Sequence, residues 1–216
     1  MSTVAVIDYG MGNLHSIAKA LQHADPSVIV TVTADRETIL QADRVVFPGV
    51  GAIRDCMAAL QRLRLDAVIR EAAAEKPLLG ICLGMQALLD SSEENGGTPC
   101  LGLIPGRVVR FAESTGNASY SQQELKVPHM GWNRVHPLHA HPVWDGLGRD
   151  RWFYFVHSYY AQPTDPRCIA ATTDYPEPFA SAVAKGNMIA VQFHPEKSQA
   201  DGLRLLANFL RWQPEP

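Results

Sequence analysis

The stretch from Leu78 to Gln86 constrains the fold more than any other part of the chain. It begins with a short apolar run typical of a buried strand and continues with apolar residues at helical spacing. Cys82 stands where the strand pattern changes into the helix pattern, and Gly80 and Gly84 flank it. Glycines there indicate a turn that is too tight for a Cβ atom beside the cysteine. This arrangement predicts an elbow that presents Cys82 as a nucleophile at the end of a strand.

The helix after Cys82 would point its free N–H groups and its positive dipole end toward the sulfur. Both favour the thiolate, which is the nucleophilic form of cysteine. The same residues also fit a buried structural cysteine at an ordinary strand-to-helix junction, because free cysteine is often buried and small residues allow close packing. The stretch alone leaves both interpretations open, so partner residues elsewhere in the chain must decide between them.

The first part of the chain alternates between strand-like and helix-like patterns. Apolar runs typical of strands buried on both faces occupy residues 4–7, 28–32, 45–47 and 78–81. Helical patterns lie between them, one capped by Asn13 and a long one from residue 53 to 71. This alternation predicts a parallel sheet with helices on both faces. The turns after Asp8, Gly49 and Cys82 would then meet at the carboxyl edge of the sheet, where such folds place their active sites.

The second part of the chain is organised differently. A polar, turn-rich stretch at residues 112–125 predicts a mobile loop, and the apolar and aromatic segment 126–133 shows no periodicity. Runs suited to antiparallel strands follow at residues 151–160, 168–173, 179–184 and 188–193. A final helix is expected from Gln199 to Leu210, with Ser198 and Asp201 as its capping box.

Together these patterns predict an α/β fold with three layers. A central, mostly parallel sheet would be flanked by helices and would continue into an additional antiparallel portion. The length is ample for such a core, and we expect one domain over residues 1–216.

Composition and charge argue against several other classes of protein. The net charge of −3 gives no electrostatic support for binding nucleic acid or an anionic membrane. The cysteines form no C-x-x-C pair, which argues against a disulfide framework or a zinc site and for a reducing compartment; they are Cys56, Cys82, Cys100 and Cys168. The sequence has neither a secretory leader pattern nor an apolar run of membrane-spanning length, so we expect a cytoplasmic protein.

Two local patterns could suggest a cofactor or a metal, and both are weak. The glycine-rich turn after Asp8 lacks the dinucleotide fingerprint, because His15 stands where the third glycine belongs. His136, His139 and His141 are irregularly spaced around two prolines, which predicts a solvated loop rather than a metal site. We therefore expect neither a cofactor nor a metal.

A thiolate nucleophile needs a base that shuttles its proton, and that base needs an orienting partner. The segment Gln192–Glu196 supplies both after the apolar run 189–191. On an extended backbone His194 and Glu196 would lie on one face, and Pro195 would stiffen that geometry. Glu196 could then accept from one imidazole nitrogen while the other faces the sulfur. The alternative is a surface histidine beside a solvated glutamate, but an elbow cysteine elsewhere in the chain favours the catalytic interpretation.

Acyl transfer also needs two N–H donors where the substrate oxygen becomes negative. In elbow enzymes one donor is the N–H that follows the nucleophile, which here belongs to Leu83. The second comes from a neighbouring strand-to-helix loop. The turn at Gly49 and Val50 is placed for this role, most simply through the N–H of Val50.

The motif pair Gly80–Gln86 and Gln192–Ser198 resembles that of class I, or triad, glutamine amidotransferases. Three further stretches resemble the HisH family, the glutaminase subunits of imidazole glycerol phosphate synthase; they are residues 8–13, 48–51 and 128–133. The resemblance extends from Val4 to Leu210 and is weakest at residues 112–125 and 136–148. It implies a flavodoxin-like, class I amidotransferase fold.

The resemblance implies a definite chemistry. Cys82 would attack the side-chain amide of glutamine, and His194, oriented by Glu196, would protonate the leaving ammonia. Water activated by His194 would then hydrolyse the glutamyl thioester. Glu94 would pair with the α-ammonium group of glutamine. The other residues that would bind the substrate by similarity are Gln86, Ser158 and Tyr159.

The resemblance also implies a partner. Ammonia would pass through a HisF-like cyclase subunit, which would use it to make imidazole glycerol phosphate and the aminoimidazole carboxamide ribotide in histidine biosynthesis. Exposed aromatic residues mark docking surfaces, so segments with such residues are candidates for the interface. The candidate residues are Met11, Asn13, Met130, Gly131, Trp132, Asn133 and Lys197.

A free glutaminase would waste glutamine, so we expect the activity to be latent without the partner. The β-branched side chain of Val50 would resist the peptide rotation that turns its N–H toward the substrate. Our hypothesis is that the peptide between Gly49 and Val50 points the wrong way in the isolated subunit. Ligand binding to the partner would shift that equilibrium.

Three alternatives remain at the level of sequence. The chain could be another cysteine hydrolase of similar architecture, such as a peptidase. It could be an inactive subunit that only binds a partner, although the complete set of Cys82, His194 and Glu196 argues against this. It could also be the amidotransferase of another synthase, such as one that makes anthranilate or GMP.

Overall fold

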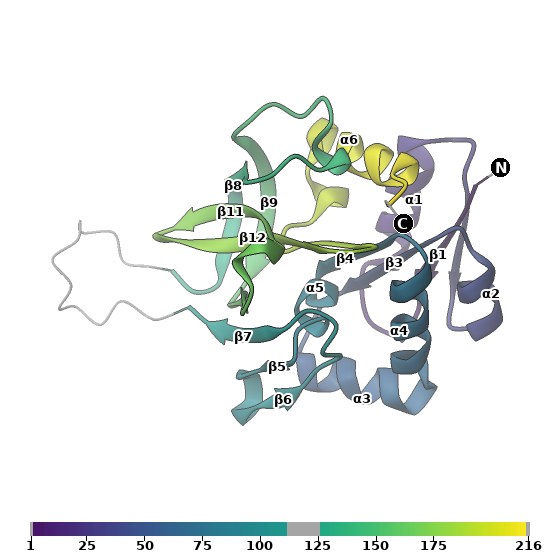
Figure 1. Cartoon of the computed structure of the whole chain (residues 1–216), viewed down its shortest axis with the longest axis horizontal. Coiled ribbons are helices and arrows are strands. Elements are labelled where there is room, and N and C mark those ends of the chain that lie inside the picture. Colours follow the sequence, from purple (N-terminus) through teal and green to yellow (C-terminus); the bar gives the residue numbers. More distant parts are fainter. Residues whose placement is uncertain (1, 112–125, 215–216) are drawn as a thin grey trace, which may run out of the picture.

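The computed structural model describes residues 2–111 and 126–214 (Figure 1). The predicted mobile loop at residues 112–125 lies outside the described residues. The main sheet contains, in spatial order, β2 (Ile29–Thr33), β1 (Thr3–Ile7), β3 (Arg44–Gly49), β4 (Leu78–Cys82), β13 (Met188–Val191), β12 (Glu177–Lys185), β10 (Tyr159–Pro163), β7 (Gly106–Arg110), β5 (Ser91–Ser92) and β6 (Thr98–Pro99).

The order and direction of these strands confirm the predicted fold class. The pairs from β2 through β1, β3 and β4 to β13 are all parallel. From β13 the sheet continues through antiparallel pairing with β12, β10 and β7. The antiparallel portion is extended by β11 (Ile169–Tyr175), β8 (His129–Pro137) and β9 (Arg151–His157).

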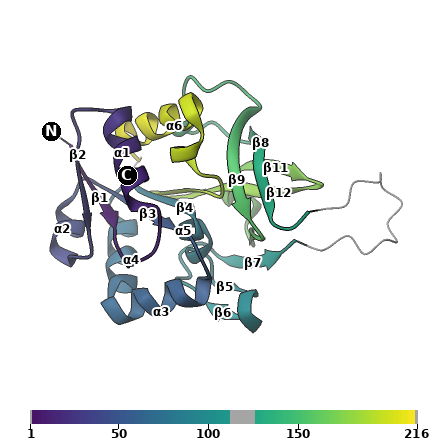
Figure 2. The same cartoon turned by 180° about the vertical axis from the view of Figure 1, so that it is seen from behind.

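Helices cover both faces of the parallel strands (Figures 1 and 2). On one face lie α1 (Leu14–Ala24) and α6 (Gln199–Arg211), and on the other lie α2 (Arg36–Gln41), α3 (Ile53–Leu63), α4 (Leu65–Glu75) and α5 (Leu83–Ala87). The alternation along β1 explains the two cores, because Val4 and Val6 pack with the first pair whereas Ala5 and Ile7 pack with the second group. Short 3₁₀ turns occupy Glu94–Gly96, Pro142–Trp144, Pro166–Cys168 and Pro195–Lys197.

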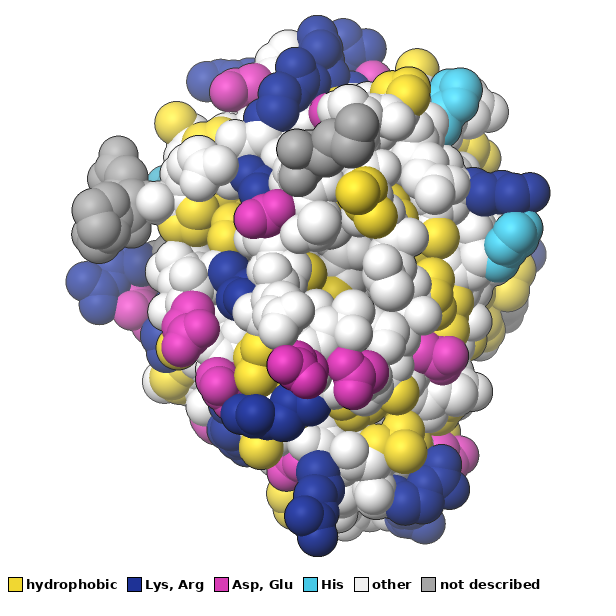
Figure 3. Space-filling model, turned by 90° about the vertical axis from the view of Figure 1, so that its right-hand side faces the viewer, with side chains coloured by type: hydrophobic (Ala, Val, Ile, Leu, Met, Phe, Trp, Pro, Cys, Tyr) yellow, Lys and Arg dark blue, Asp and Glu magenta, His cyan; other side chains and the backbone are white. Residues whose placement is uncertain are grey.

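The end of the molecule that carries α2 and the edge strand β2 has a mixed surface. Apolar, acidic and basic side chains are interspersed there (Figure 3). Ile29 and Val32 on β2 are exposed among them. Within the described ranges no helix has the length and apolar character needed to cross a bilayer.

The predicted helix from residue 53 to 71 is wrong in one respect, because it is two helices. Arg64 adopts a left-handed conformation with φ of 56°, which ends α3 and starts α4. Leu60 and Leu65, on either side of the break, are both buried. The break therefore lets each helix turn its own apolar stripe toward the sheet.

Two predicted helix caps also differ from the structure. Asn13 stands before α1 but makes no side-chain cap. The Ser198 and Asp201 capping box is wrong, since the Ser198 hydroxyl donates to the His194 carbonyl at 2.6 Å and accepts from the Tyr154 N–H at 3.0 Å. Ser198 is buried, so tertiary partners outcompete the local N–H groups of the helix.

The segment 126–133, which shows no periodicity in sequence, contains the start of strand β8. Its alternation is hidden because the inward positions are polar or small, at His129, Gly131 and Asn133, and the outward positions are large and apolar, at Met130 and Trp132. The same strand includes His136, which contacts Asp150 and is not in the predicted solvated loop.

The elbow depends on the absence of a side chain at residue 84. A Cβ atom at Gly84 would lie 1.9 Å from the carbonyl oxygen of Phe47. We therefore expect Gly84→Ala to lower the free energy of unfolding by about 3 kcal/mol or more, because a backbone atom must move. Urea denaturation measures the effect.

Gly148→Ala is the matched control for that substitution. Its Cβ would meet the guanidinium of Arg151 at 3.1 Å, and a flexible side chain can move aside. A Gly84→Ala protein as stable as the Gly148→Ala protein would show that the close approach of α5 to β3 is not required.

Candidate active site

Cys82 is the last residue of β4, and α5 begins at the next residue. Its backbone has φ of 54° and ψ of −108°, a conformation that a residue with a side chain rarely adopts. Such strain persists only where the surroundings enforce it. Here a Cβ atom at Gly80 would lie 3.2 Å from the backbone nitrogen of Met85, so the strand before the turn and the helix after it are packed in close contact.

The β-strand register brings the predicted site segments together. Gly49 at the end of β3 is paired with Cys82 at the end of β4. β13 lies on the other side of β4, and the chain leaving β13 leads to His194. The carboxyl ends of three adjacent parallel strands therefore meet at the sulfur. The sequence pattern placed residues 188–193 among the antiparallel runs, and this is correct only on one side, because β13 is antiparallel to β12 but parallel to β4.

His194 and Glu196 form a buried pair. His194 Nδ1 and Glu196 Oε1 are 2.9 Å apart, and the two side chains are 3% and 4% exposed. The backbone differs from the predicted extended form, because Pro195–Lys197 is a 3₁₀ turn that folds the carboxylate back onto the ring. Hydrogen bonds from the His194 N–H to the Tyr154 carbonyl and from Ser198 to the His194 carbonyl hold the backbone in place.

The charge state of His194 follows from its surroundings. Burial disfavours the imidazolium, but interaction with the neighbouring Cys82 and Glu196 outweighs it and raises the pKa of His194 to about 10. The remaining nitrogen, Nε2, is buried and makes no hydrogen bond to any of the described residues. A protonated Nε2 beside the cavity that also contains Cys82 can stabilise a thiolate and can donate a proton to a leaving group.

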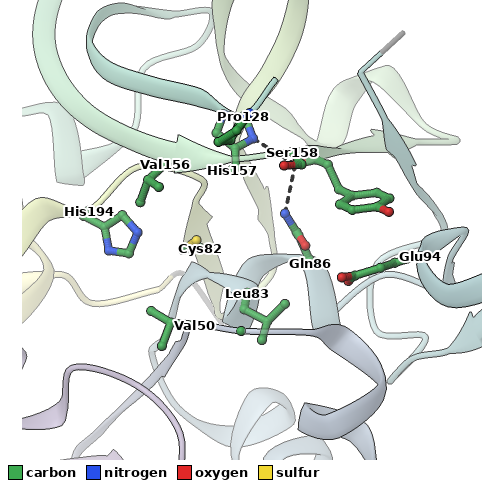
Figure 4. Close-up of a pocket in the computed structure, with 12 residues that line it drawn as sticks. Val50, Cys82, Leu83, Gln86, Glu94, Pro128, Val156, His157, Ser158 and His194 are labelled. Carbon is green, nitrogen blue, oxygen red and sulfur yellow. Dashed lines mark hydrogen bonds between the residues drawn. The ribbon is translucent and has the colours of Figure 1, made fainter. Parts of the chain in front are cut away.

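A cavity of about 340 Å³ opens at this edge of the sheet (Figure 4). It brings together most of the predicted site residues. Those that line it are Val50, Cys82, Leu83, Gln86, Glu94, Ser158, Tyr159 and His194. Gly49 and Glu196 do not line it, and instead border a much smaller adjoining hollow with Asn13 and His194.

The side-chain amide of Gln86 has both of its hydrogens in use. Nε2 donates to the Tyr159 carbonyl at 2.9 Å and to Gln192 Oε1 at 3.1 Å. This orients Gln86 Oε1 as the group left to accept from a bound molecule. Glu94 on the cavity wall also has an internal partner, because its Oε2 accepts from the N–H of Ile53 at the start of α3 at 3.1 Å.

Two residues of this site were not predicted from the sequence. Gln192 is fully buried and its Nε2 lies 3.7 Å from Cys82 Sγ, at hydrogen-bonding distance for sulfur. The sequence offered one signal for Gln192, namely its position in the same short segment as His194. Tyr9 is buried and donates to the Pro48 carbonyl at 3.0 Å, and its hydroxyl would lie 2.4 Å from a Cβ atom at Gly49. Only glycine therefore fits at residue 49.

The predicted interface residues differ in exposure. Met130 is 62% and Trp132 is 43% exposed, on the outward side of β8. Asn13 and Lys197 are also exposed, Met11 and Gly131 are half-buried, and Asn133 is half-buried with its amide directed inward. Trp152 on β9 was not among the predicted interface residues; it is 48% exposed and packs under Arg134. We call the outward surface formed by Met130, Trp132, Arg134 and Trp152 the β8–β9 face.

Comparison with known proteins agrees with this geometry. The family model described as glutamine amidotransferase class-I matches residues 5–212. The imidazole glycerol phosphate synthase subunit HisH of Methylococcus capsulatus is 71% identical over 216 residues, which cover 99% of this chain and 98% of that protein. The HisH subunit of Nitrosococcus oceani is 58% identical over 212 residues, with 98% of each chain covered.

Solved structures with little sequence similarity have the same fold. A crystal structure titled glutamine amidotransferase has a TM-score of 0.71 at 18% identity and covers 96% of this chain and 97% of its own. The PurLQS structure from Thermotoga maritima has a TM-score of 0.72 at 16% identity, with 97% and 98% covered. The chain belongs to the class I glutamine amidotransferases and, within them, to the HisH family.

Proposed function

We propose that this chain is the glutaminase subunit of an imidazole glycerol phosphate synthase and that it supplies ammonia to a HisF-type cyclase. The observation that carries the proposal is that Cys82 and His194 line one cavity together with Gln86 and Glu94, while Glu196 is paired with His194 from behind. A cysteine peptidase would not need an acceptor and a carboxylate placed to bind a free amino acid.

The reaction follows from the charge states of the pair. The Cys82 thiolate attacks the side-chain carbonyl carbon of glutamine, and the protonated Nε2 of His194 gives its proton to the departing ammonia. A glutamyl thioester remains and His194 is neutral. His194 then takes a proton from water, the hydroxide attacks the thioester, and the sulfur leaves as thiolate. Glutamate is released and the starting charges are restored.

The cavity wall supplies the binding groups for this reaction. We assign the two N–H donors for the developing oxyanion to Leu83 and to the Gly49–Val50 turn. Glu94 would pair with the α-ammonium group of glutamine. Gln86 Oε1 would accept a hydrogen bond from that ammonium group or from the side-chain amide of the substrate. Ser158 and Tyr159 also line the cavity, and the Tyr159 carbonyl holds the Gln86 amide.

We propose that the cyclase docks on the β8–β9 face and on the exposed residues near it. Exposed large apolar side chains on this face, together with Lys197 over the ring of Tyr154, form the kind of patch that protein interfaces use. The predicted contacts Met11 and Asn13 would extend the same interface.

The ammonia would pass through the cyclase to form imidazole glycerol phosphate and the aminoimidazole carboxamide ribotide. Residues 1–216 would act as one domain in the cytoplasm.

Cys82→Ala tests the proposed function. In the complex reconstituted with a HisF-type cyclase, we expect glutamine-dependent turnover to fall below detection, because the nucleophile is gone. Ammonia-dependent turnover should remain at the wild-type rate, since the cyclase is untouched. Steady-state assays with each nitrogen source measure both. If glutamine-dependent turnover survives, Cys82 is not the nucleophile; if both activities fail, its role is structural.

The raised pKa of His194 predicts a pH dependence. Because the imidazolium is retained up to about pH 10, kcat/KM of the complex for glutamine should stay level from neutral pH and fall only as pH approaches 10. Glu196→Gln removes a charge that raises this pKa, so the falling limb should move to lower pH, with kcat/KM reduced by ~10²-fold. A Glu196→Gln profile that overlays the wild type would contradict the assigned role.

The latent-activity hypothesis is tested with the subunit alone. We expect glutamine hydrolysis by the isolated chain to be at least ~10²-fold slower than in the complex with a liganded cyclase, the cost of losing an oxyanion donor. Val50→Gly should raise the rate of the isolated chain, because it removes the β-branched barrier to peptide rotation. Equal rates for the free and complexed wild-type chain would rule out this mechanism.

A further inference from the structure

Two histidines outside the Cys82–His194–Glu196 set form a buried pair. His129 on β8 and His157 at the end of β9 are 3% and 6% exposed and stand directly opposite each other in the strand register. His129 Nδ1 lies 2.9 Å from His157 Nε2. Neither has a role in the chemistry proposed above, although His157 lines the cavity.

The hydrogen-bond partners determine the tautomer of each ring. His157 Nδ1 lies 2.8 Å from the Tyr159 carbonyl, which can only accept, so Nδ1 carries the proton and Nε2 is the acceptor. His129 Nδ1 must therefore donate to His157 Nε2. His129 Nε2 is then an acceptor, and it receives the amide of Asn133 at 3.1 Å. The Asn133 amide is oriented in turn, because it also donates to the Asp174 carbonyl at 3.0 Å.

The surroundings keep both rings neutral. His129 stacks between Phe155 and Tyr175, with ring centroids 4.8 and 3.9 Å away, and Phe179 contacts both histidines by its edge or at a tilt. Burial in this aromatic setting lowers the pKa of His129 to about 4 and that of His157 to about 3. At neutral pH each ring is therefore one donor and one acceptor, as the hydrogen bonds require.

The chain of hydrogen bonds ends at the nucleophile. The Tyr159 carbonyl accepts from His157 on one side and from Gln86 on the other. Gln86 also donates to Gln192, whose own amide contacts the Cys82 sulfur. The network thus runs from strand β8 through the two histidines to the groups that border the substrate cavity.

We propose that His129 and His157 are positioning residues that hold the Tyr159 carbonyl and, through it, orient Gln86 and Gln192 beside Cys82. This inference rests on the proposed glutaminase function. Its physical basis is that the Tyr159 carbonyl, at the first residue of β10, accepts from two donors. Loss of the His157 donor leaves Gln86 as the remaining side-chain donor and lets the carbonyl shift toward it, which changes the orientation of the Gln86 amide. His157 lines the cavity, but both of its ring nitrogens are engaged by His129 and the Tyr159 carbonyl, so its polar atoms act through these groups.

The test compares two substitutions at each histidine in the reconstituted complex. His157→Phe and His129→Phe keep an aromatic ring but remove the donor and the acceptor. His157→Gln and His129→Gln restore one donor and one acceptor. We expect the Phe variants to raise KM for glutamine about tenfold, with a smaller fall in kcat, and the Gln variants to stay within about threefold of wild type. Ammonia-dependent turnover should not change in any of them.

His139 provides the matched control, because it is exposed and outside the network. His139→Phe and His139→Gln should leave both activities unchanged. Wild-type kinetics in the Phe variants, or equal impairment of Phe and Gln variants, would overturn the proposal. A wild-type complex that hydrolyses no glutamine would instead overturn the proposed function, so the two failures are distinguishable.

A measurement without substitution covers the case in which the Phe variants do not fold. Nitrogen-15 NMR of histidine in the wild-type complex at pH 7 should show His129 and His157 as neutral tautomers protonated on Nδ1. Labelling Cys82 with a glutamine-mimicking diazoketone should shift the His157 nitrogen resonances. The proposal would be overturned if either ring were an imidazolium or were protonated on Nε2 alone. It would also be overturned if the His157 resonances did not change after Cys82 is labelled.

Discussion

The structure depends on one close approach, between the start of α5 and the end of β3. Gly84 lies so near the Phe47 carbonyl that no side chain fits between them, and this contact draws the helix directly under the strand end. In the turn that joins them, Cys82 adopts a positive φ of 54°. The strain at Cys82 is therefore imposed by packing in the core, and its consequence is a sulfur held at the open edge of the sheet.

The buried His194–Glu196 pair is the second constraint, and it is electrostatic whereas the first is steric. Burying an ion pair is costly, and the cost is offset only by good geometry and by charges that complete one another. Here the carboxylate and the imidazole are joined by one hydrogen bond, and the sulfur lies on the same cavity as the remaining ring nitrogen. Removing either the imidazole or the carboxylate leaves the other group buried without its partner, which ties the stability of this edge to the pair.

Strand β8 lies between the outer surface and this edge, and its side chains are distributed in the opposite way to those of an ordinary surface strand. Its large apolar side chains Met130 and Trp132 face outward on the β8–β9 face, and its polar side chains His129 and Asn133 face inward. The inward His129 and Asn133 would be costly to bury alone, but each finds a partner on a neighbouring strand or turn. One strand thus carries exposed apolar side chains on one side and, on the other, a histidine that contacts the cavity-lining His157.

The sequence by itself determined the parallel sheet, the elbow at Cys82 and the pairing of His194 with Glu196, because these depend on periodicity and on residues a few positions apart. It did not reveal the division of the long helix at Arg64, the tertiary partners of Ser198, or strand β8, whose inward polar residues hide the alternation. It also missed Gln192 beside Cys82 and His129 beside His157. Those contacts join residues 110 and 28 positions apart, and only the folded chain decides which buried polar groups satisfy one another.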